Sequence, residues 1–427
     1  MTHSLRVLHV LHNSLPLVCG YSIRSGAIVS HQRNQGLDPI VVTSSRQPDS
    51  VEGRVEYIDG IAHFRTGAHV EPNLPILRER ALMRHLQQRV EQVIDETRPH
   101  IVHAHSPVLV GLPALLAARK YGLPFVYEIR DLWENASVDR GKFRYNSPFY
   151  RLARGLETYV LRRADAVVTI CDALRWDVTT RVSDPHRVYV VGNGVDAGAF
   201  DASSVKVPDD LRRRWRVDGK RVIAYVGTFQ PYEGLDLLIQ SMPAILASAP
   251  NTHLLIVGGS AGESTAVEQA LEARVESLAL GSHVTFTGRV PHSMVKSAYA
   301  IADIVVCPRL LTRTTALTTP LKPLEAMAMG RPLVISDVPG MRELVREGYT
   351  GVTFPAGDAD ALARVCLRLL GDTGLRRALG QRARVWVGEH RQWPTIVARY
   401  RDIYNRLAEL TLFPEPVSDE EVATVVH

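Results

Sequence analysis

The sequence predicts an α/β protein built from two doubly wound domains, each with a parallel sheet covered by helices on both faces. Short β-branched runs recur along the chain with helix-length segments between most of them. The strand-like run Arg221–Val226 opens a second series of such segments, as Leu5–Leu11 opens the first. These runs are continuously apolar, which is typical of parallel strands buried on both faces. The 427 residues are enough for two or three domains.

The first series begins with the strand at Leu5–Leu11, a loop that leads to Gly20, and a helix at Ser25–Gln35. Its further predicted strands are Pro39–Thr43, Ile101–His105, Phe125–Ile129, Ala166–Ile170 and Val188–Val191. The second series begins with Arg221–Val226, followed at once by Gly227 and by a helix at Leu235–Leu246. Its further strands are Thr252–Val257, Val284–Thr287, Ile304–Cys307, Pro332–Ile335 and Gly351–Phe354. Ligands of such sheets bind beyond the carboxyl ends of the strands, so we expect a cleft between the two domains.

We place the domain boundaries at residues 1–191, 192–390, 391–412 and 413–427. The join falls at Gly192-Asn193-Gly194, where glycine would permit positive φ and a sharp reversal of the chain. Trp393–Leu410 has apolar residues at helical spacing, so an amphipathic helix is expected there, crossing back to the N-terminal domain. The acidic, proline-containing residues from Pro414 onward are expected to form a loose tail.

The amino-acid composition excludes several classes of protein. Hydrophobic residues make up 45% and charged residues 22% of the chain, as in ordinary globular proteins. No apolar run reaches the roughly 18 residues of a membrane span, and we see no signal peptide, so a cytoplasmic location is expected. The net charge of +5 favours an anionic partner. No nucleic-acid-binding motif is visible, so we do not expect a nucleic acid as that partner. The four cysteines are scattered, without metal-ligand spacing.

The segment from Leu317 to Gly330 is the most informative part of the chain. A proline-punctuated loop carries Lys322, and a short apolar helix is predicted to begin around Glu325 and to end at Gly330. The first amides of a helix lack internal partners and favour anions, and Lys322 adds a full positive charge. Glu325 is suited to accept hydrogen bonds from sugar hydroxyls. The alternative is an ordinary loop–helix–strand connection with a solvated lysine.

Asp358-Ala-Asp360 imitates an Asp-x-Asp metal motif. It stands directly before a predicted helix at Ala361–Leu370, where aspartate is a common N-cap. We therefore interpret it as structural, and we expect neither a metal ion nor another cofactor.

Several strings occur in order that are known from one enzyme family. They are Gly192-Asn-Gly-Val-Asp196, Gly258-Gly259, Pro323-Leu-Glu-Ala-Met-Ala-Met-Gly330-Arg-Pro332 and Ser336-Asp-Val-Pro-Gly340 with Glu343-Leu344 and Gly348-Tyr-Thr-Gly351. Together they resemble glycosyltransferase family 4, whose members are retaining enzymes of GT-B architecture. Tyr127–Trp133 and Thr319–Glu325 resemble a narrower group, bacterial exopolysaccharide or exosortase-associated glycosyltransferases.

The resemblance implies that a nucleotide-sugar donor binds to the C-terminal domain. The second Glu of the family's Glu-x7-Glu motif, which binds the ribose, matches Glu325, whereas the first falls on Leu317. Relatives carry an Arg and a Lys after the strand that opens this domain, but here Thr228 and Glu233 occupy those positions. We expect Lys322 to replace these cations, with help from Thr228, from the amides near Glu325, and from Arg309 or Arg313. The donor-binding set expected from the resemblance is Gly20, Gly227, Thr228, Arg289, Val290, Lys322, Leu324 and Glu325.

In the N-terminal half, His105 matches a histidine that contacts the transferred sugar in relatives. It is either a catalytic residue, together with Lys322 and Glu325, or a buried core histidine, because His103 and His105 share one side of their strand. Glu128, Arg130 and Asp131 end the next strand and are expected to bind the acceptor. Alternatively, Glu128 and Arg130 form a structural ion pair.

The resemblance implies a retaining, metal-independent hexosyltransferase that uses a nucleotide-diphosphate sugar and a glycan or polyprenyl-linked acceptor. No pair of carboxylates suited to a covalent glycosyl intermediate is obvious. Residues 140–163 interleave arginines with aromatics, which suits either peripheral docking on an anionic membrane or an ordinary helix surface with core aromatics. Two other functions stay open: a nucleotide-sugar epimerase of the same fold, and a catalytically weakened binding subunit.

Overall fold

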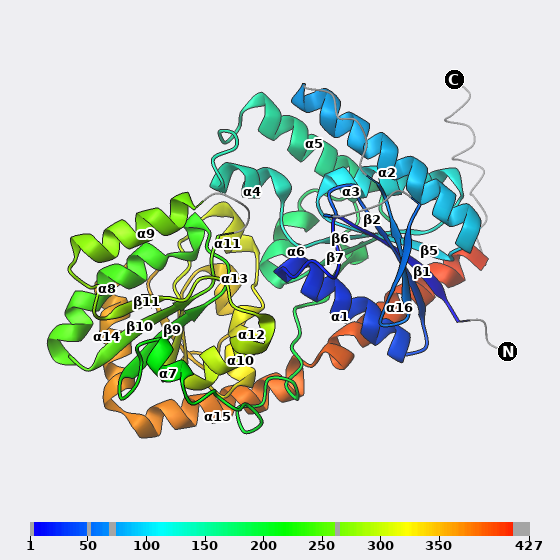
Figure 1. Ribbon diagram of the computed structural model, residues 1–427. Coiled ribbons are helices and arrows are strands. Elements are labelled where there is room, and N and C mark those ends of the chain that lie inside the picture. Colours follow the sequence, from blue (N-terminus) through cyan, green and yellow to red (C-terminus); the bar gives the residue numbers. More distant parts are fainter. Residues whose placement is uncertain (1–3, 49–52, 68–73, 261–264, 413–427) are drawn as a thin grey trace.

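The structure is a computed structural model that describes residues 4–48, 53–67, 74–260 and 265–412. Two α/β domains lie side by side, and the last helices run along both of them (Figure 1). The N-terminal domain contains an eight-stranded sheet and the C-terminal domain a six-stranded sheet. The two doubly wound domains expected from the sequence are therefore present.

The sheet of the N-terminal domain has the order β3-β4-β2-β1-β5-β6-β7-β8. Every neighbouring pair is parallel except β3 and β4. Its strands are β1 Arg6–Leu11, β2 Asp38–Thr43, β3 Val55–Ile58, β4 Ile61–Arg65, β5 Ile101–His105, β6 Phe125–Ile129, β7 Ala166–Thr169 and β8 Val188–Val190. Its helices are α1 Gly20–Asn34, α2 Pro75–Thr97, α3 Val108–Lys120, α4 Trp133–Asp139, α5 Pro148–Arg163 and α6 Asp172–Thr179.

The sheet of the C-terminal domain is fully parallel, with the order β11-β10-β9-β12-β13-β14. Its strands are β9 Arg221–Val226, β10 Thr252–Val257, β11 Val284–Phe286, β12 Ile304–Cys307, β13 Leu333–Ser336 and β14 Val352–Phe354. Its helices are α7 Leu211–Arg214, α8 Leu235–Ser248, α9 Ala266–Ser277, α10 His292–Ile301, α11 Arg313–Leu317, α12 Lys322–Ala328, α13 Pro339–Arg342, α14 Ala359–Gly371 and α15 Thr373–His390. Two apolar clusters, one on each face of this sheet, form its core.

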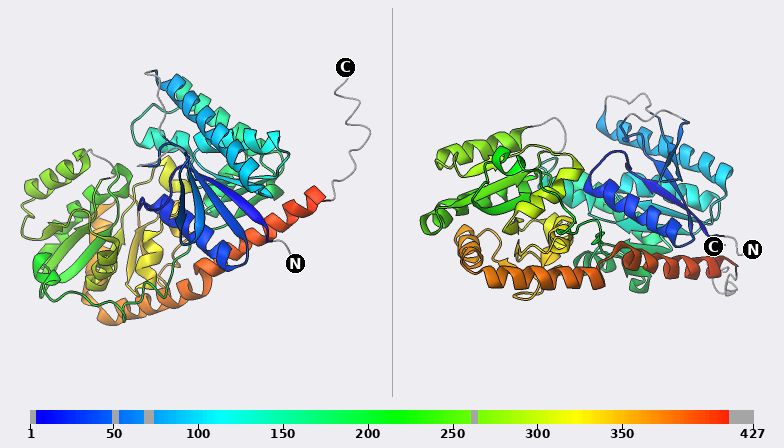
Figure 2. Two further views of the ribbon diagram at one scale, coloured as in Figure 1. Left: turned by 45° about the vertical axis from the view of Figure 1, so that its right-hand side comes forward. Right: turned by 60° about the horizontal axis from the view of Figure 1, so that its bottom comes forward.

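The last helix, α16 Trp393–Leu412, returns to the N-terminal domain as expected. Its apolar face, including Trp393, Val397 and Tyr404, packs against Val7 and Ile28 of that domain. Figure 2 shows α15 and α16 following one another along the same side of both domains. The expected tail at 413–427 lies outside the described residues. No helix among the described residues is long and apolar enough to cross a membrane.

Three local expectations from the sequence were wrong. The helix expected at Ser25–Gln35 begins earlier, at Gly20, and ends at Asn34. The helix near Glu325 begins earlier, at Lys322, and Pro323 occupies an early helical position where its missing N–H has no cost. Gly192 and Gly194 do not have positive φ. They are required for close approach instead, because a Cβ would lie 2.4 Å from Arg391 Nη1 at the first position and 2.8 Å from the Trp393 ring at the second.

The antiparallel pair β3–β4 was also missed. Its turn is Asp59-Gly60, and both residues have positive φ, as a tight two-residue hairpin requires. β3 lies at the edge of the sheet with partly exposed side chains, so it lacks the continuous apolar run that marked the other strands.

Candidate active site

Three charged side chains meet at the carboxyl end of β9. Lys322 Nζ, from the start of α12, donates to Glu233 Oε2 at 2.9 Å, and Arg309 Nη2 donates to Glu233 Oε1 at 2.8 Å. Tyr225 of β9 accepts from Lys322 Nζ at 2.6 Å and donates its hydroxyl hydrogen bond to the Glu233 carboxylate or the Thr228 carbonyl. Lys322 thus supplies positive charge near this strand, where the sequence lacks the two cations that relatives carry.

The carboxylate of Glu233 is buried, with 3% of the residue exposed. Burial alone would raise the pKa of Glu233, but the charges of Arg309 and Lys322 outweigh it and lower the pKa to about 2. The group of two cations and one anion therefore carries a net charge of +1 at neutral pH. A net positive charge suits an anionic group.

Glycines let the backbone approach this cluster. Gly227, directly after β9, has φ of +148°, and a Cβ there would lie 2.0 Å from Lys322 Cε. Gly234 has φ of +73°, and a Cβ there would lie 1.9 Å from the Pro308 carbonyl oxygen. The close contact at Gly234 holds Glu233 beside the segment that carries Arg309.

Glu325 lies one turn after Lys322 on α12 and is partly buried. The hydroxyl of Tyr299, from α10, donates to Glu325 Oε2 at 2.9 Å. The expectation of free amides around Glu325 is wrong, because the N–H groups of Leu324 and Glu325 both donate to the Leu321 carbonyl. The side chain of Leu324 is fully buried in the core of the domain. Side chains, not helix amides, therefore supply the polar groups here.

The other residues of the expected donor set come from several elements of both domains. Thr228 is exposed, but its carbonyl and not its hydroxyl contacts Tyr225 and Lys322. Arg289 is exposed and donates to the Ser260 carbonyl, and Val290 packs against the apolar core. Gly20 is the first residue of α1, with open space where a Cβ would lie.

Leu317, which replaces the first acid of the Glu-x7-Glu pattern, packs against the core of the N-terminal domain. Its carbonyl accepts from Cys171 Sγ at 3.1 Å. The hydroxyls of the next two threonines are also engaged, Thr318 Oγ1 with the Thr314 carbonyl and Thr319 Oγ1 with Asn193 Nδ2. An apolar residue at 317 therefore serves contact between the domains.

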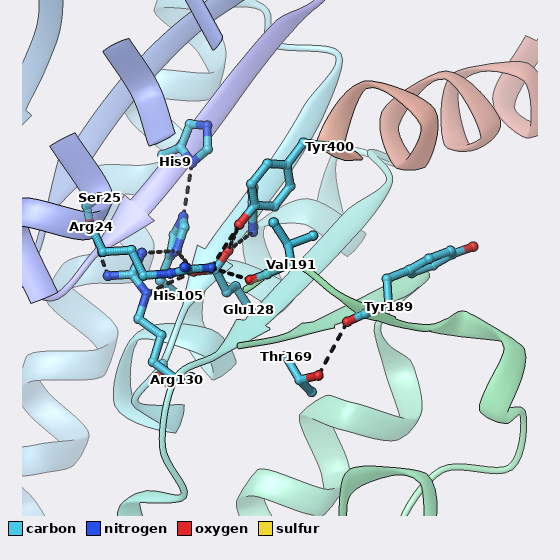
Figure 3. A network of polar contacts seen from close by, with 12 residues as sticks. His9, Arg24, Ser25, His105, Glu128, Arg130, Thr169, Tyr189, Val191 and Tyr400 are labelled. Atoms are coloured by element: carbon cyan, nitrogen blue, oxygen red, sulfur yellow. Dashed lines mark hydrogen bonds and ion pairs between the residues drawn. The ribbon is translucent and has the colours of Figure 1, made fainter. Parts of the chain in front are cut away.

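A buried polar network lies in the N-terminal domain, where side chains of several strands and helices meet (Figure 3). Glu128 is fully buried and accepts from Arg24 Nε at 3.1 Å, from Arg130 Nε at 2.9 Å and from the Tyr400 hydroxyl of α16. Burial alone would raise the pKa of Glu128, but the two guanidinium groups hold it well below its usual range. The ion pair between Arg130 and Glu128 that was left open as an alternative is present. Nearby, burial raises the pKa of Asp131.

His105, expected as catalytic, is fully buried in the same network. Burial lowers the pKa of His105 to about 4 and that of His9 to about 3, so both rings are neutral at pH 7. Their partners then fix the tautomers. Arg130 Nη2 donates to His105 Nδ1 at 2.8 Å, His105 Nε2 donates to His9 Nδ1 at 3.0 Å, and His9 Nε2 donates to Gln32 Oε1 at 2.8 Å. The series continues through Gln32 to Tyr404 of α16.

His9, His103 and His105 place one ring nitrogen each within 4.8 Å of one another, as in some metal sites. The hydrogen-bond series uses the lone pairs of His9 and His105, however, and Arg24 and Arg130 lie close by. A cationic surrounding and occupied lone pairs favour a hydrogen-bonded network over a metal site. The Asp358-Ala-Asp360 string has the capping role expected from the sequence, because Asp358 caps α14 by accepting from the Ala361 N–H at 2.7 Å.

The network is connected to the C-terminal domain. Arg24 Nη1 donates to Asn193 Oδ1 at 3.0 Å, and Asn193 Nδ2 donates to the Thr319 carbonyl at 2.7 Å. Glu343 bridges the domains a second time by accepting from the first amides of α6, those of Asp172 at 2.9 Å and Ala173 at 2.7 Å. The segment that leads to Lys322 is thus held by the N-terminal domain.

Both halves of the chain match models of glycosyltransferase families. The family described as "Glycosyl transferases group 1" matches residues 208–386, and the "Glycosyl transferase 4-like domain" matches residues 20–194. Together the two matches account for well over half of the chain. The chain is a glycosyltransferase of the GT-B type.

Curated relatives of this glycosyltransferase are similar over much of their length. The alpha-maltose-1-phosphate synthase of Mycolicibacterium smegmatis is 27% identical over 361 residues, which cover 81% of this chain and 89% of the relative. The D-inositol 3-phosphate glycosyltransferase of Jonesia denitrificans is 29% identical over 66% of each chain.

Solved structures share the fold of the glycosyltransferase. Sucrose-phosphate synthase from Thermosynechococcus elongatus has a TM-score of 0.77 at 21% identity, covering 94% of this chain and 99% of the other. Anabaena Alr3699/HepE in complex with UDP-glucose has a TM-score of 0.71 at 17% identity, covering 94% and 100%. The predicted GT-B fold class is confirmed.

Sequence reasoning missed four residues that hold the glycosyltransferase's site together: Arg24, Tyr225, Tyr299 and, as a partner of cations, Glu233. No local motif marks the two tyrosines. From the sequence, Tyr225 is predicted to be a core residue of a strand and Tyr299 a core residue of a helix. Glu233 was noticed only because a lysine was expected in its place.

Proposed function

We propose that this protein is a retaining hexosyltransferase. It moves a hexose-type sugar from a nucleotide-diphosphate sugar to a glycan or lipid-linked acceptor, without a resident metal, in bacterial exopolysaccharide or cell-surface glycan synthesis. The observation that carries the proposal is the pair of cations, Lys322 and Arg309, held on the buried Glu233 beside Gly227. The relatives support a sugar nucleotide as donor, since Alr3699/HepE was solved with UDP-glucose.

In the proposed reaction, the bond between the anomeric carbon and the donor phosphate breaks as the acceptor oxygen bonds to the same face of that carbon. The departing phosphate oxygen takes the proton of the acceptor hydroxyl, so no protein nucleophile is needed. Lys322 and Arg309 stabilise the negative charge that builds up on the diphosphate. Glu325, positioned by Tyr299, accepts hydrogen bonds from the ribose hydroxyls.

We also propose that the protein docks on the inner face of an anionic membrane through residues 140–163. In this segment Phe149 and Leu152 are each more than half exposed, whereas Tyr150 is buried. Exposed aromatic and aliphatic side chains among arginines are typical of peripheral membrane surfaces. Co-sedimentation with phosphatidylglycerol vesicles should fall for Phe149→Ser, and unchanged sedimentation would remove this segment from the docking surface.

The experiment that tests the main proposal measures nucleoside diphosphate release from a panel of nucleotide sugars, with and without acceptors. Lys322→Ala should lower donor turnover by at least about tenfold while the circular dichroism spectrum stays native. Lys206→Ala, which changes an exposed lysine elsewhere in the domain, is the matched control. Equal turnover of the Lys322 variant and the wild type would remove Lys322 from the site.

The same panel separates the two other functions that the sequence left open. Conversion of the donor to its epimer without release of nucleoside diphosphate would indicate an epimerase. Donor binding without turnover under every acceptor would indicate a binding subunit. Either result would overturn the proposal.

A further inference from the structure

A cavity of about 640 Å³ opens between the two domains. Helices α4, α5 and α6 of the N-terminal domain form one side, and residues 311–317 of the C-terminal domain form the other. α11 contacts α4 and α6, and these elements face each other in Figure 1. Glu128, Arg130 and Asp131, from which acceptor binding was expected, do not line this cavity.

The two acidic residues of the cavity wall already have partners within the protein. Asp139 Oδ2 accepts from the Thr314 N–H at 2.9 Å, which also joins the domains. Asp177 Oδ1 lies 2.7 Å from Arg181 Nη2, a guanidinium group that is almost completely buried. Asp177 is therefore paired with a cation, which it shares with Glu134, whereas Asp139, whose partner is a neutral amide, keeps its negative charge.

The basic residues of the wall are not neutralised in this way. Within the described part of the chain, neither Arg154 nor Arg313 forms an ion pair. The Arg313 guanidinium instead lies 3.6 Å from the centroid of the Tyr145 ring. Tyr145 and Tyr150 provide aromatic surface in the same wall. The cavity thus combines two arginines that form no ion pair with the described residues, one from each domain, with the single unpaired carboxylate of Asp139 and with aromatic rings against which a sugar or polyol can pack.

One residue of the cavity wall belongs to the segment that leads to the proposed donor site. Leu317 lines the cavity, and Lys322 follows five residues later along the chain. We propose that this cavity is the acceptor site and that the acceptor carries a phosphate or diphosphate group, which binds Arg154 and Arg313. This inference rests on the proposed transferase function and names the class of its second substrate.

A phosphate-bearing acceptor can be a soluble sugar phosphate or the headgroup of a polyprenyl phosphate. Binding would be measured calorimetrically on the full chain saturated with nucleoside diphosphate, so that the cations of the donor site are occupied. Glucose 1-phosphate and glucose 6-phosphate, against glucose, probe the soluble source. Undecaprenyl phosphate against undecaprenol, both in detergent, probes the lipid source.

The phosphorylated member of at least one pair should bind, and its neutral counterpart should bind at least about tenfold more weakly. Arg154→Gln and Arg313→Gln should each weaken that binding about tenfold or more, the usual effect of losing a charged hydrogen-bond partner. Arg364→Gln, at an exposed position of α14, makes the same change of net charge outside the cavity lining and should leave binding unchanged.

Three results would overturn the inference: equal binding of charged and neutral probes, no binding of any phosphorylated probe, or an equal loss in the Arg364 control. Binding of nucleoside diphosphate to the same variants is measured separately. If the wild type binds no nucleoside diphosphate, the proposed transferase function itself fails. If it does bind and the arginine variants behave as wild type toward the probes, only the acceptor inference fails.

Discussion

Lys322 Nζ lies 2.9 Å from Glu233 Oε2, although 89 residues separate the two in the chain. Their pairing explains how the site keeps positive charge where a glutamate stands in the position expected for a lysine. The carboxylate is shared with Arg309, so the three groups together retain one net positive charge. A buried anion that fixes two cations holds them ready for a diphosphate without reorganisation.

Glu233→Gln should destabilise the protein by about 3 kcal/mol, because it leaves two partly buried cations without their anion. Since the pKa of Glu233 is lowered to about 2, the ionised carboxylate stabilises the folded state above about pH 4.5. This stabilisation is lost as the pH falls toward about 2. Urea unfolding at pH 7 measures the difference, with exposed Glu272→Gln as the control.

The same variant tests whether these cations face the donor. A nucleoside diphosphate would supply the missing negative charge, so its stabilising effect should be larger on Glu233→Gln than on the wild type. A loss of stability without a larger ligand effect would mean that the cluster is structural and does not meet the diphosphate.

Tyr299→Phe should raise the KM for the donor about three- to tenfold, because one net hydrogen bond to Glu325 is lost. We expect a smaller change in kcat, since the ribose does not take part in the bond changes. Tyr349→Phe, whose side chain is half exposed, is the control. For a donor without ribose hydroxyls, the KM should be the same for Tyr299→Phe as for the wild type. A difference in KM that persists with this donor would contradict the role of Tyr299 through Glu325.

Gly227→Ala should abolish donor binding while most of the fold is retained. Its Cβ would lie 2.0 Å from Lys322 Cε, so the lysine side chain has to leave Glu233. Gly219→Ala is the matched control, because that glycine also has positive φ but an added Cβ there would meet nothing within 4 Å. The affinity of each variant for nucleoside diphosphate is measured by titration. Equal affinity of Gly227→Ala and Gly219→Ala would show that only backbone strain, and not the contact with Lys322, acts at residue 227.

Local patterns were enough to predict most of the fold. Predominantly apolar runs such as Ile101–His105 and Thr252–Val257 became strands with the predicted bounds, because strands buried on both faces carry apolar residues at most positions. The β3–β4 hairpin lacks such an apolar run, although its Asp59-Gly60 turn could have predicted a hairpin. The sequence drew attention to the glycines at 192 and 194, but it could not show why glycine is needed there. The close contacts are with Arg391 and Trp393, which lie far along the chain.

The site could be predicted only in part for the same reason. Lys322 and Glu325 stand in one short segment, so the sequence brings them together. Their supports, Tyr225 and Tyr299, come from other elements, and only the folded chain places them within hydrogen-bond distance. The burial of His105 likewise depends on α16, whose Tyr404 closes the hydrogen-bond series from the other end of the sequence.

The last prediction concerns Glu157 of α5, which is fully buried near Glu134. Burial, reinforced by the charge of Glu134, raises the pKa of Glu157 to about 8. In the unfolded chain an ordinary glutamate titrates near about pH 4.3, so between about pH 4.5 and 8 unfolding releases a proton from this group. The native state then binds more protons than the unfolded state, and the free energy of unfolding must fall as the pH rises through that window.

Glu157→Gln removes this titration with little change of shape. The variant should match the wild type near about pH 5 and become more stable as the pH approaches about 8, by an amount on the order of a few kcal/mol. Urea unfolding between pH 5 and 8.5 gives the profile, and exposed Glu96→Gln should run parallel to the wild type throughout. A constant difference between Glu157→Gln and the wild type across this range would mean that Glu157 is ionised in the native state, because only a native proton on the carboxyl makes the difference grow with pH.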